Sequence, residues 1–154
     1  DLTLDYAKSL MELGKFDKAR IQLETVPNTS SKQFLANAYS SFLTFILSGD
    51  CSSAQKLLHL KNVEETIKGK VIISNLPPDA ELLKLSTLYF YFRRDYKRAG
   101  IYCSWLIRYV NDIKGQEVAC EKADIERYFE NDRLYLSIQA ARNSKLMDKR
   151  ETTP

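Results

Sequence analysis

The chain has 154 residues, of which 44% are hydrophobic and 28% are charged, and its formal net charge is +3. This composition is typical of a globular domain with a buried core, and it excludes a disordered polar segment. Glycine and proline are scarce, with five and four residues, which argues against an all-β fold rich in turns. The small net charge argues against a dedicated nucleic-acid-binding domain, which usually carries a clustered basic stripe.

The cysteines and the apolar runs indicate the compartment. Cys51, Cys103 and Cys120 form no Cys-x-x-Cys pair, and an odd number of cysteines does not suit a disulfide framework. We therefore expect an intracellular protein, cytoplasmic or nuclear. No apolar run in the sequence reaches the roughly 20 residues that cross a bilayer, and no signal peptide is recognisable, so no membrane contact is expected. The chain begins at Asp1 rather than Met, which suggests a fragment of a longer protein.

A first helix pair is predicted over residues 5–26. Gly14 divides its apolar pattern into two short helices, and Pro27 ends the second helix. Two such short helices cannot bury their apolar faces alone, so neighbouring pairs must stack on them. The apolar or small residues recur at helical steps of three and four: Tyr6, Ala7, Leu10, Phe16, Ala19, Leu23 and Val26.

Two further pairs are predicted, over residues 31–61 and 80–113. The second pair turns at Gly49 and has the small residue Ala54 in its second helix. The third pair turns at Arg94-Asp95, where arginine replaces the turn glycine, and Ala99 takes the small position. The repeat spacing is close to that of helical-repeat proteins between the first two pairs and longer before the third.

An insert is expected at residues 62–78, between the second and third pairs. Its β-branched run at 71–73 is interpreted as a buried extended loop or as a self-ligand that fills part of a groove. Asp79 is predicted to cap the third pair. Residues 120–147 are helical in pattern with a break expected at Asn131-Asp132, which predicts another pair or a capping helix. One domain is thus expected over 1–148, followed by a polar tail at 149–154.

The first pair resembles the tetratricopeptide repeat. This resemblance implies an all-α, right-handed solenoid of about three antiparallel helix–turn–helix pairs plus C-terminal helices, acting as a non-enzymatic scaffold that binds other proteins in a complex. The positions that carry it are the small residue of the first helix, the turn glycine, the aromatic and small residues after it, and the large apolar residues between and beyond them: Ala7, Leu10, Gly14, Phe16, Ala19, Leu23 and Val26.

A narrower resemblance concerns the segments AKSLMELGKFDKA and FLANAYSSFL. They are similar to the opening repeats of the tetratricopeptide subunits of the anaphase-promoting complex. Those subunits are scaffolds that self-pair through their N-terminal repeats. The similarity implies a cell-cycle ubiquitin-ligase assembly and a homodimer.

In the tetratricopeptide family the first helices of successive pairs line a concave groove. An apolar strip of this kind would suit an extended peptide, an amphipathic helix or a second copy of the domain, unless the insert or the last helix covers it. The clamp with which some members grip a chaperone carboxylate is not expected, because only Lys84 fits its pattern. By position, the partner-binding residues implied are Lys8, Tyr39, Leu43, Ile46, Lys84, Leu88 and Tyr91, with Met11 beside them.

No catalytic, cofactor or metal site is expected. The only histidine, His59, is interpreted as a part-buried helix residue, and neither zinc-ligand spacing nor a phosphate-binding glycine motif is present in the sequence. Cys103 is interpreted as a core residue. Trp105 is interpreted as packing in the core or between repeats, with a surface hot spot for binding as the alternative. An enzymatic role resting on Cys103 or His59 is the least favoured alternative.

The densest basic cluster straddles the turn of the third pair. Its plainest interpretation is a solvated turn, but it would also suit an acidic partner segment. Because tyrosines lie nearby in the sequence, the alternative function is an RNA-binding helical repeat that combines phosphate contacts with base stacking. The cluster consists of Arg93, Arg94, Lys97 and Arg98.

Overall fold

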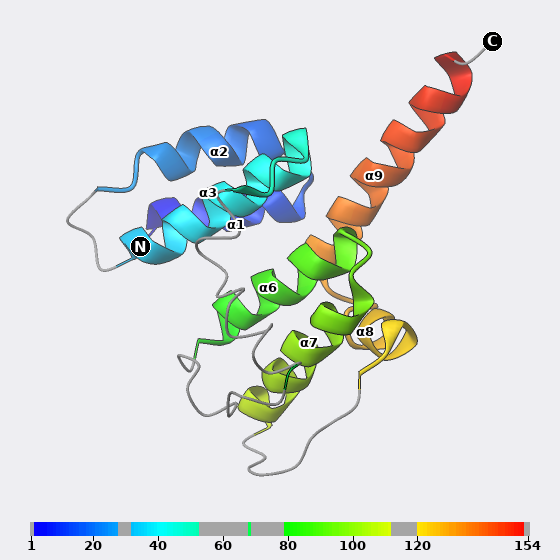
Figure 1. Cartoon of the computed structure of the whole chain (residues 1–154). Coiled ribbons are helices and arrows are strands. Elements are labelled where there is room, and N and C mark those ends of the chain that lie inside the picture. Colours follow the sequence, from blue (N-terminus) through cyan, green and yellow to red (C-terminus); the bar gives the residue numbers. More distant parts are fainter. Residues whose placement is uncertain (1, 28–31, 53–67, 69–78, 112–119, 153–154) are drawn as a thin grey trace. The chain divides into compact units, whose positions relative to one another are not determined.

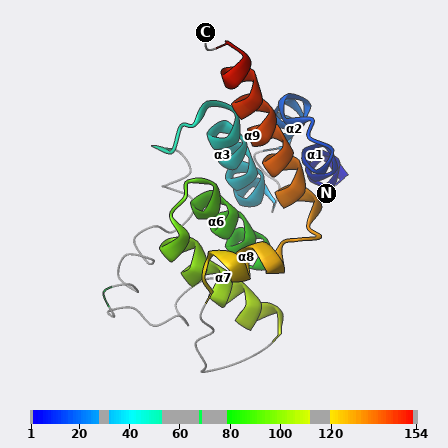
Figure 2. The same ribbon diagram turned by 90° about the vertical axis from the view of Figure 1, so that its right-hand side faces the viewer.

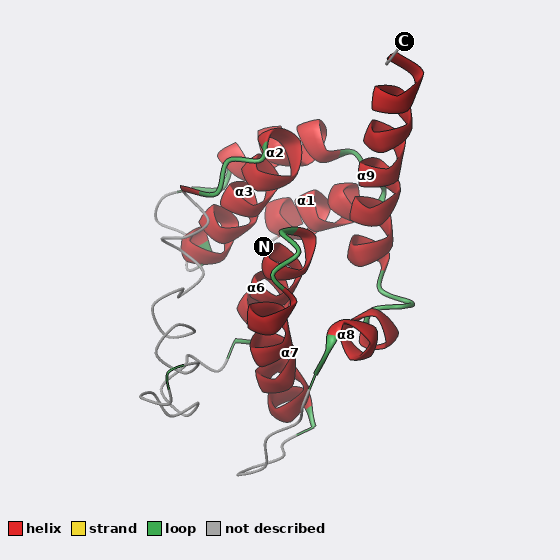
Figure 3. Cartoon of the chain, turned by 45° about the vertical axis from the view of Figure 1, so that its right-hand side comes forward, coloured by secondary structure: helices red, strands yellow, loops and turns green. Residues whose placement is uncertain are grey.

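The structure is a computed structural model that describes residues 2–27, 32–52, 68, 79–111 and 120–152, with only the backbone described at 145–152. Within these residues all regular secondary structure is helical and no strand occurs, so the predicted all-α class is confirmed (Figure 3). The helices are α1 (Leu2–Glu12), α2 (Phe16–Glu24), α3 (Gln33–Ser48), α6 (Ala80–Phe92), α7 (Tyr96–Val110), α8 (Lys122–Tyr128) and α9 (Arg133–Thr152).

The chain divides into two compact units, where the sequence predicted one continuous repeat domain. The first unit combines Asp1–Ala36 with Phe129–Pro154, and the second is Asn37–Tyr128. The helix α3 therefore begins in the first unit and continues in the second. The backbone of α9 is helical as far as Thr152, so most of the segment predicted as a polar tail is helical.

The first unit is built on the predicted pair α1 and α2, which pack side by side (Figure 1). Ala7 and Ala19 are fully buried, and their small side chains let the two helix backbones approach closely. Phe16 and Leu23 fill the remaining space of this core. The helix α9 packs on α1, where the Ser137 hydroxyl donates a hydrogen bond of 2.8 Å to the Met11 carbonyl oxygen.

The second unit is built on the pair α6 and α7, with α8 packed against α7 (Figure 2). Ala99, Cys103 and Trp105 are buried, which confirms that all three are core residues. The rings of Phe90 and Tyr102 stack with centroids 5.5 Å apart, so aromatic packing joins the two helices.

The start of α6 is capped as the sequence predicted. The Asp79 carboxylate accepts hydrogen bonds from the backbone N–H groups of Glu81 at 3.0 Å and Leu82 at 3.2 Å. These bonds satisfy two of the donors that a helix leaves unpaired at its N-terminus.

The two pairs end their first helices with the same turn. Gly14 has φ of 78° and Arg94 has φ of 64°, so both residues adopt the left-handed conformation. In the first turn, Gly14 N donates to the Met11 oxygen at 3.0 Å, and Lys15 N donates to the Leu10 oxygen at 2.9 Å. This pair of hydrogen bonds is the Schellman motif, in which two otherwise unpaired helix carbonyl groups are satisfied.

The third pair repeats this pattern residue for residue. Arg94 N donates to the Tyr91 oxygen at 2.9 Å, and Asp95 N donates to the Phe90 oxygen at 3.0 Å. The turn after α3 is also left-handed, with Gly49 at φ of 78°. All three turns that the sequence predicted are therefore present, and the arginine adopts the conformation of the glycine that it replaces.

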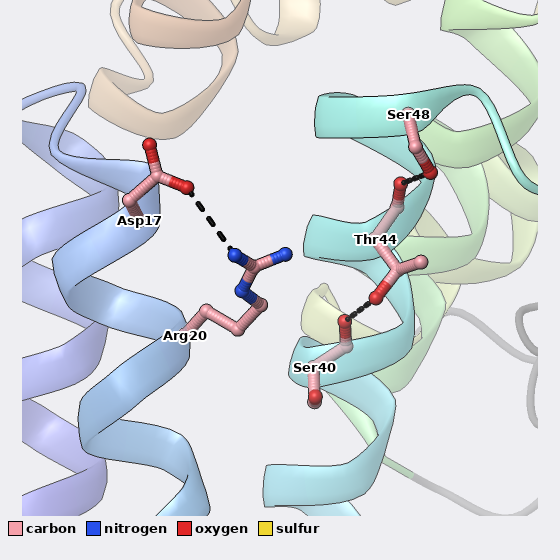
Figure 4. A network of polar contacts seen from close by, with 5 residues as sticks. All are labelled: Asp17, Arg20, Ser40, Thr44 and Ser48. Atoms are coloured by element: carbon pink, nitrogen blue, oxygen red, sulfur yellow. Dashed lines mark hydrogen bonds and ion pairs between the residues drawn. The ribbon is translucent and has the colours of Figure 1, made fainter.

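Hydroxyl groups on the helices bond within their own helix. On α3, Thr44 donates to the Ser40 carbonyl oxygen at 3.0 Å, and Ser48 donates to that of Thr44 at 2.7 Å (Figure 4). The charged pair Asp17–Arg20 on α2, 3.5 Å apart, is likewise confined to one helix (Figure 4). These groups satisfy their bonding locally and demand no particular neighbour.

Several predictions fall outside the described residues. These are the second helix of the second pair, with Ala54 and His59, and the insert at 62–78 apart from Lys68. The break expected at Asn131-Asp132 is confirmed, because α8 ends before it and α9 begins after it.

Candidate functional site

The apolar part of the predicted partner-binding strip is buried. Each of its five apolar and aromatic side chains is at most 6% exposed, so of the two alternatives that the sequence left open, an open or a covered strip, the structure shows a covered one at these positions. A role of these residues in partner binding stays a prediction. The five residues are Tyr39, Leu43, Ile46, Leu88 and Tyr91.

Both tyrosines of the strip are held by carboxylates on other helices. The Tyr39 hydroxyl donates to Glu81 Oε2 at 2.8 Å, and the Tyr91 hydroxyl donates to Glu126 Oε2 at 2.7 Å. A hydrogen bond to a charged acceptor is stronger than one between neutral groups, so these bonds hold α3 on α6 and α6 on α8. At Tyr91 the strip is in contact with α8, whereas the sequence indicated the insert or the last helix as its possible cover.

The two lysines of the strip are partly exposed. Lys8 lies 3.8 Å from the Asp5 carboxylate on the same helix, and Lys84 is half-buried on α6. An ion pair between partly exposed groups contributes little to stability, so Lys8 can exchange this partner for another anion at small cost. The lysines are thus the only members of the strip that reach solvent.

Two of the four basic side chains in the predicted cluster have partners close by. Arg93 donates to the Tyr89 hydroxyl at 2.9 Å and lies 5.2 Å from the centre of that ring. Arg98 forms an ion pair with Asp95 at 2.6 Å. Arg94 and Lys97 are exposed. The cluster therefore presents a weaker positive surface than the sequence suggested, because the charge of Arg98 is offset by Asp95.

An apolar cleft that the sequence analysis missed lies in the first unit. It has a volume of about 530 Å³ and an apolar lining with one acidic and one basic residue. Leu13 is 69% exposed and Leu136 is 47% exposed, although both are large apolar residues. The lining residues come from the end of α1 and the start of α9: Glu12, Leu13, Gly14, Arg133, Leu136, Ser137, Ala140 and Ala141.

The sequence contains a weak signal for this cleft. Leu13 immediately precedes the turn glycine and falls outside the buried positions of α1. An apolar residue outside the periodic pattern marks exposed apolar surface, but single exposed leucines are common in monomeric proteins. Only the packing of α9 on α1 shows that two of them share a cleft.

Two cysteines of the second unit lie together. Cys103 is buried on α7, and Cys120 is half-buried just before α8. The interaction between the two thiols is the main cause that lowers the pKa of Cys120, and together with burial it raises the pKa of Cys103. Cys103 is therefore the thiol that holds its proton more tightly.

Other classes of site find no support in the described part of the chain. Among residues 2–27, 32–52, 68, 79–111 and 120–152, no three histidine, cysteine or acidic side chains gather as a metal site would require. In the same residues no helix combines the length and the apolar character that a membrane crossing needs.

The chain was compared with family models, curated proteins and solved structures. No family model matches the chain, and no curated protein or solved structure is significantly similar to it. The tetratricopeptide relationship thus stays a prediction that rests on the repeat itself.

Proposed function

We propose that the chain is a non-enzymatic scaffold of the tetratricopeptide type that binds a partner protein within a larger intracellular complex. The observation that carries this proposal is the repetition of one helix pair with one turn geometry. Left-handed residues at Gly14 and Arg94 close the same two backbone hydrogen bonds in both pairs. Pairs of this kind stack into solenoids, whose extended surfaces bind proteins.

The packing positions of the two pairs correspond at the same offset as their turns, since 94 − 14 and 99 − 19 both equal 80. Ala7 and Thr87 occupy equivalent places on the first helices, and Ala19 and Ala99 on the second, and all four are fully buried. A repeat that keeps both its turn and its close-packed positions supports an array of like pairs.

In this proposal the partner binds in the cleft between α1 and α9. The cleft is an open depression of about 530 Å³, and its two exposed leucines supply apolar surface on which a partner can pack. Glu12 and Arg133 at its edge provide one charge of each sign. The occupant proposed is an amphipathic helical segment of the partner, because a groove between helices takes such a segment by its apolar face.

The proposal is tested by capture of partners from a lysate on the tagged chain, with and without nuclease, followed by mass identification. Leu13→Ser combined with Leu136→Ser should remove proteins that the unaltered chain retains. The matched control is Ile21→Ser, because Ile21 is 59% exposed on α2 and lies outside the lining of the cleft. Circular dichroism checks that both variants keep their helicity.

Equal capture by the double variant and the unaltered chain would remove the cleft from the proposal. Capture that nuclease abolishes would move the function to RNA binding, the alternative read from the basic cluster. That alternative is less favoured, because the positive charge of Arg98 is offset by Asp95. Membership of a cell-cycle ubiquitin-ligase assembly, or pairing with a second copy, rests only on the resemblance of the opening repeats and would follow from the captured proteins.

A further inference from the structure

The contact between Cys103 and Cys120 depends on a glycine of α7. A Cβ atom built on Gly100 would overlap the carbonyl oxygen of Cys120, so only a glycine lets the Cys120 backbone approach the helix there. Cys103 follows Gly100 by three residues and thus lies on the same face, about one turn further along. With its backbone against Gly100, Cys120 lies near Cys103 on the same face of α7, and each thiol shifts the pKa of the other.

We propose that Cys103 and Cys120 are a modification site, a dithiol that hydrogen peroxide converts into an intramolecular disulfide. The proposal is independent of the scaffold function. It assigns the two thiols different tasks, because one is half-buried and the other fully buried.

Cys120 reacts first. It is the more accessible thiol, and the interaction with Cys103 stabilises its thiolate and lowers its pKa, against opposing contributions from burial and Asp124. The Cys120 sulfur attacks one peroxide oxygen and the O–O bond breaks. The departing hydroxide takes a proton and leaves as water, so Cys120 becomes a sulfenic acid.

Cys103 then resolves this intermediate. Its sulfur attacks the sulfur of Cys120, the S–O bond breaks, and the departing hydroxide takes the Cys103 proton to form a second water. In total, two thiols are oxidised to one disulfide and one peroxide is reduced to two waters. The raised pKa of Cys103 does not prevent this step, because its proton leaves with the departing group.

The disulfide would tie Cys120, two residues before α8, to the middle of α7. The helix α8 carries Glu126, which accepts the hydrogen bond from the buried Tyr91. Oxidation would therefore fix the helix that holds one tyrosine of the predicted partner strip.

The test oxidises the folded full chain with hydrogen peroxide and counts its free thiols. The three free cysteines should fall to one, and peptide mapping without reductant should find Cys103 linked to Cys120. In Cys51→Ser, which removes the only other cysteine, free thiols should fall from two to none. In Cys103→Ser, Cys120 should stop at the sulfenic acid, which a dimedone probe traps.

The control Cys120→Ser should leave the buried Cys103 unmodified. Gly100→Ala should slow disulfide formation without slowing the first oxidation of Cys120, because the added methyl group displaces the Cys120 backbone. A disulfide to Cys51, disulfides mainly between chains, or a persistent sulfenic acid in the unaltered chain would each overturn the proposal.

Discussion

Replacement of Arg94 by glycine is expected to stabilise the second unit. Arg94 is the only non-glycine residue in the described part of the chain with a positive φ, at 64°. A side chain with a Cβ atom is strained in this conformation, whereas glycine adopts it freely. The equivalent turn of the first pair already has glycine, at φ of 78°.

The expected gain follows from two opposing contributions. The left-handed conformation costs a residue with a Cβ atom about 1–2 kcal/mol. Glycine in turn lowers the free energy of unfolding by about 0.4–1 kcal/mol, because its unfolded backbone has more conformational freedom to lose. The difference for Arg94→Gly is a rise of about 1 kcal/mol in the free energy of unfolding.

Urea unfolding followed by the fluorescence of the single tryptophan measures this gain. Trp105 is buried in α7 of the same unit, so its emission reports on the pair that Arg94 connects. With a slope of about 1–3 kcal/mol per molar urea, the midpoint should rise by about 0.5 M. The control Arg94→Ala removes the arginine side chain but keeps the Cβ atom, and it should change the midpoint little.

Gly14→Ala is the reciprocal test in the first pair. No atom lies within 4 Å of a Cβ built on Gly14, so the variant introduces backbone strain without a clash. Its free energy of unfolding should fall by about 1 kcal/mol, measured by urea unfolding followed by circular dichroism. A lower midpoint for Arg94→Gly, or a gain that Arg94→Ala matches, would refute the argument, because the gain would then not come from the backbone conformation.

Three further outcomes are expected. Ala99→Leu should overpack the α6–α7 pair and lower the free energy of unfolding by about 1–3 kcal/mol, measured by thermal unfolding; an unchanged transition would show that the helix contact at Ala99 is looser than described. Asp79→Ala should cost about 1 kcal/mol in urea unfolding by removing the cap of α6, and Asp79→Asn should recover most of it. Burial, followed by the interaction with Cys51, raises the pKa of Tyr89 from 10.0 to about 12. The folded state therefore holds this proton more tightly than the unfolded state, and the free energy of unfolding that this contributes below about pH 10 should be lost as the pH rises from about 10 to about 12. Tyr89→Phe should show a smaller fall over the same range.

Local features of the fold were predictable because they depend on neighbours in sequence. The turns at Gly14 and Arg94-Asp95 follow from the helical period on either side of them, and the cap at Asp79 from its place before an apolar run. The burial of Ala99, Cys103 and Trp105 follows from the same period. Each of these predictions needs only a few residues of context.

The partner-binding strip could not be judged from sequence, because contacts far along the chain decide its exposure. Tyr39 bonds to Glu81, 42 residues away, and Tyr91 bonds to Glu126, 35 residues away. Periodicity marks the apolar face of a helix but does not say what covers it. The contact of Cys103 with Cys120 is equally hidden, since it depends on the space above Gly100.

The buried hydroxyls of α6 have a consequence for how such a chain can change. Ser86 and Thr87 are buried, yet their hydroxyls donate to the Leu82 and Leu83 carbonyl oxygens of their own helix at 2.8 Å each. Because both hydroxyls are satisfied inside α6, a different apolar neighbour could replace the present one without leaving these groups unpaired. This face of α6 is thus interchangeable in its packing, which suits it to exchange of adjoining helices in engineered chimaeras.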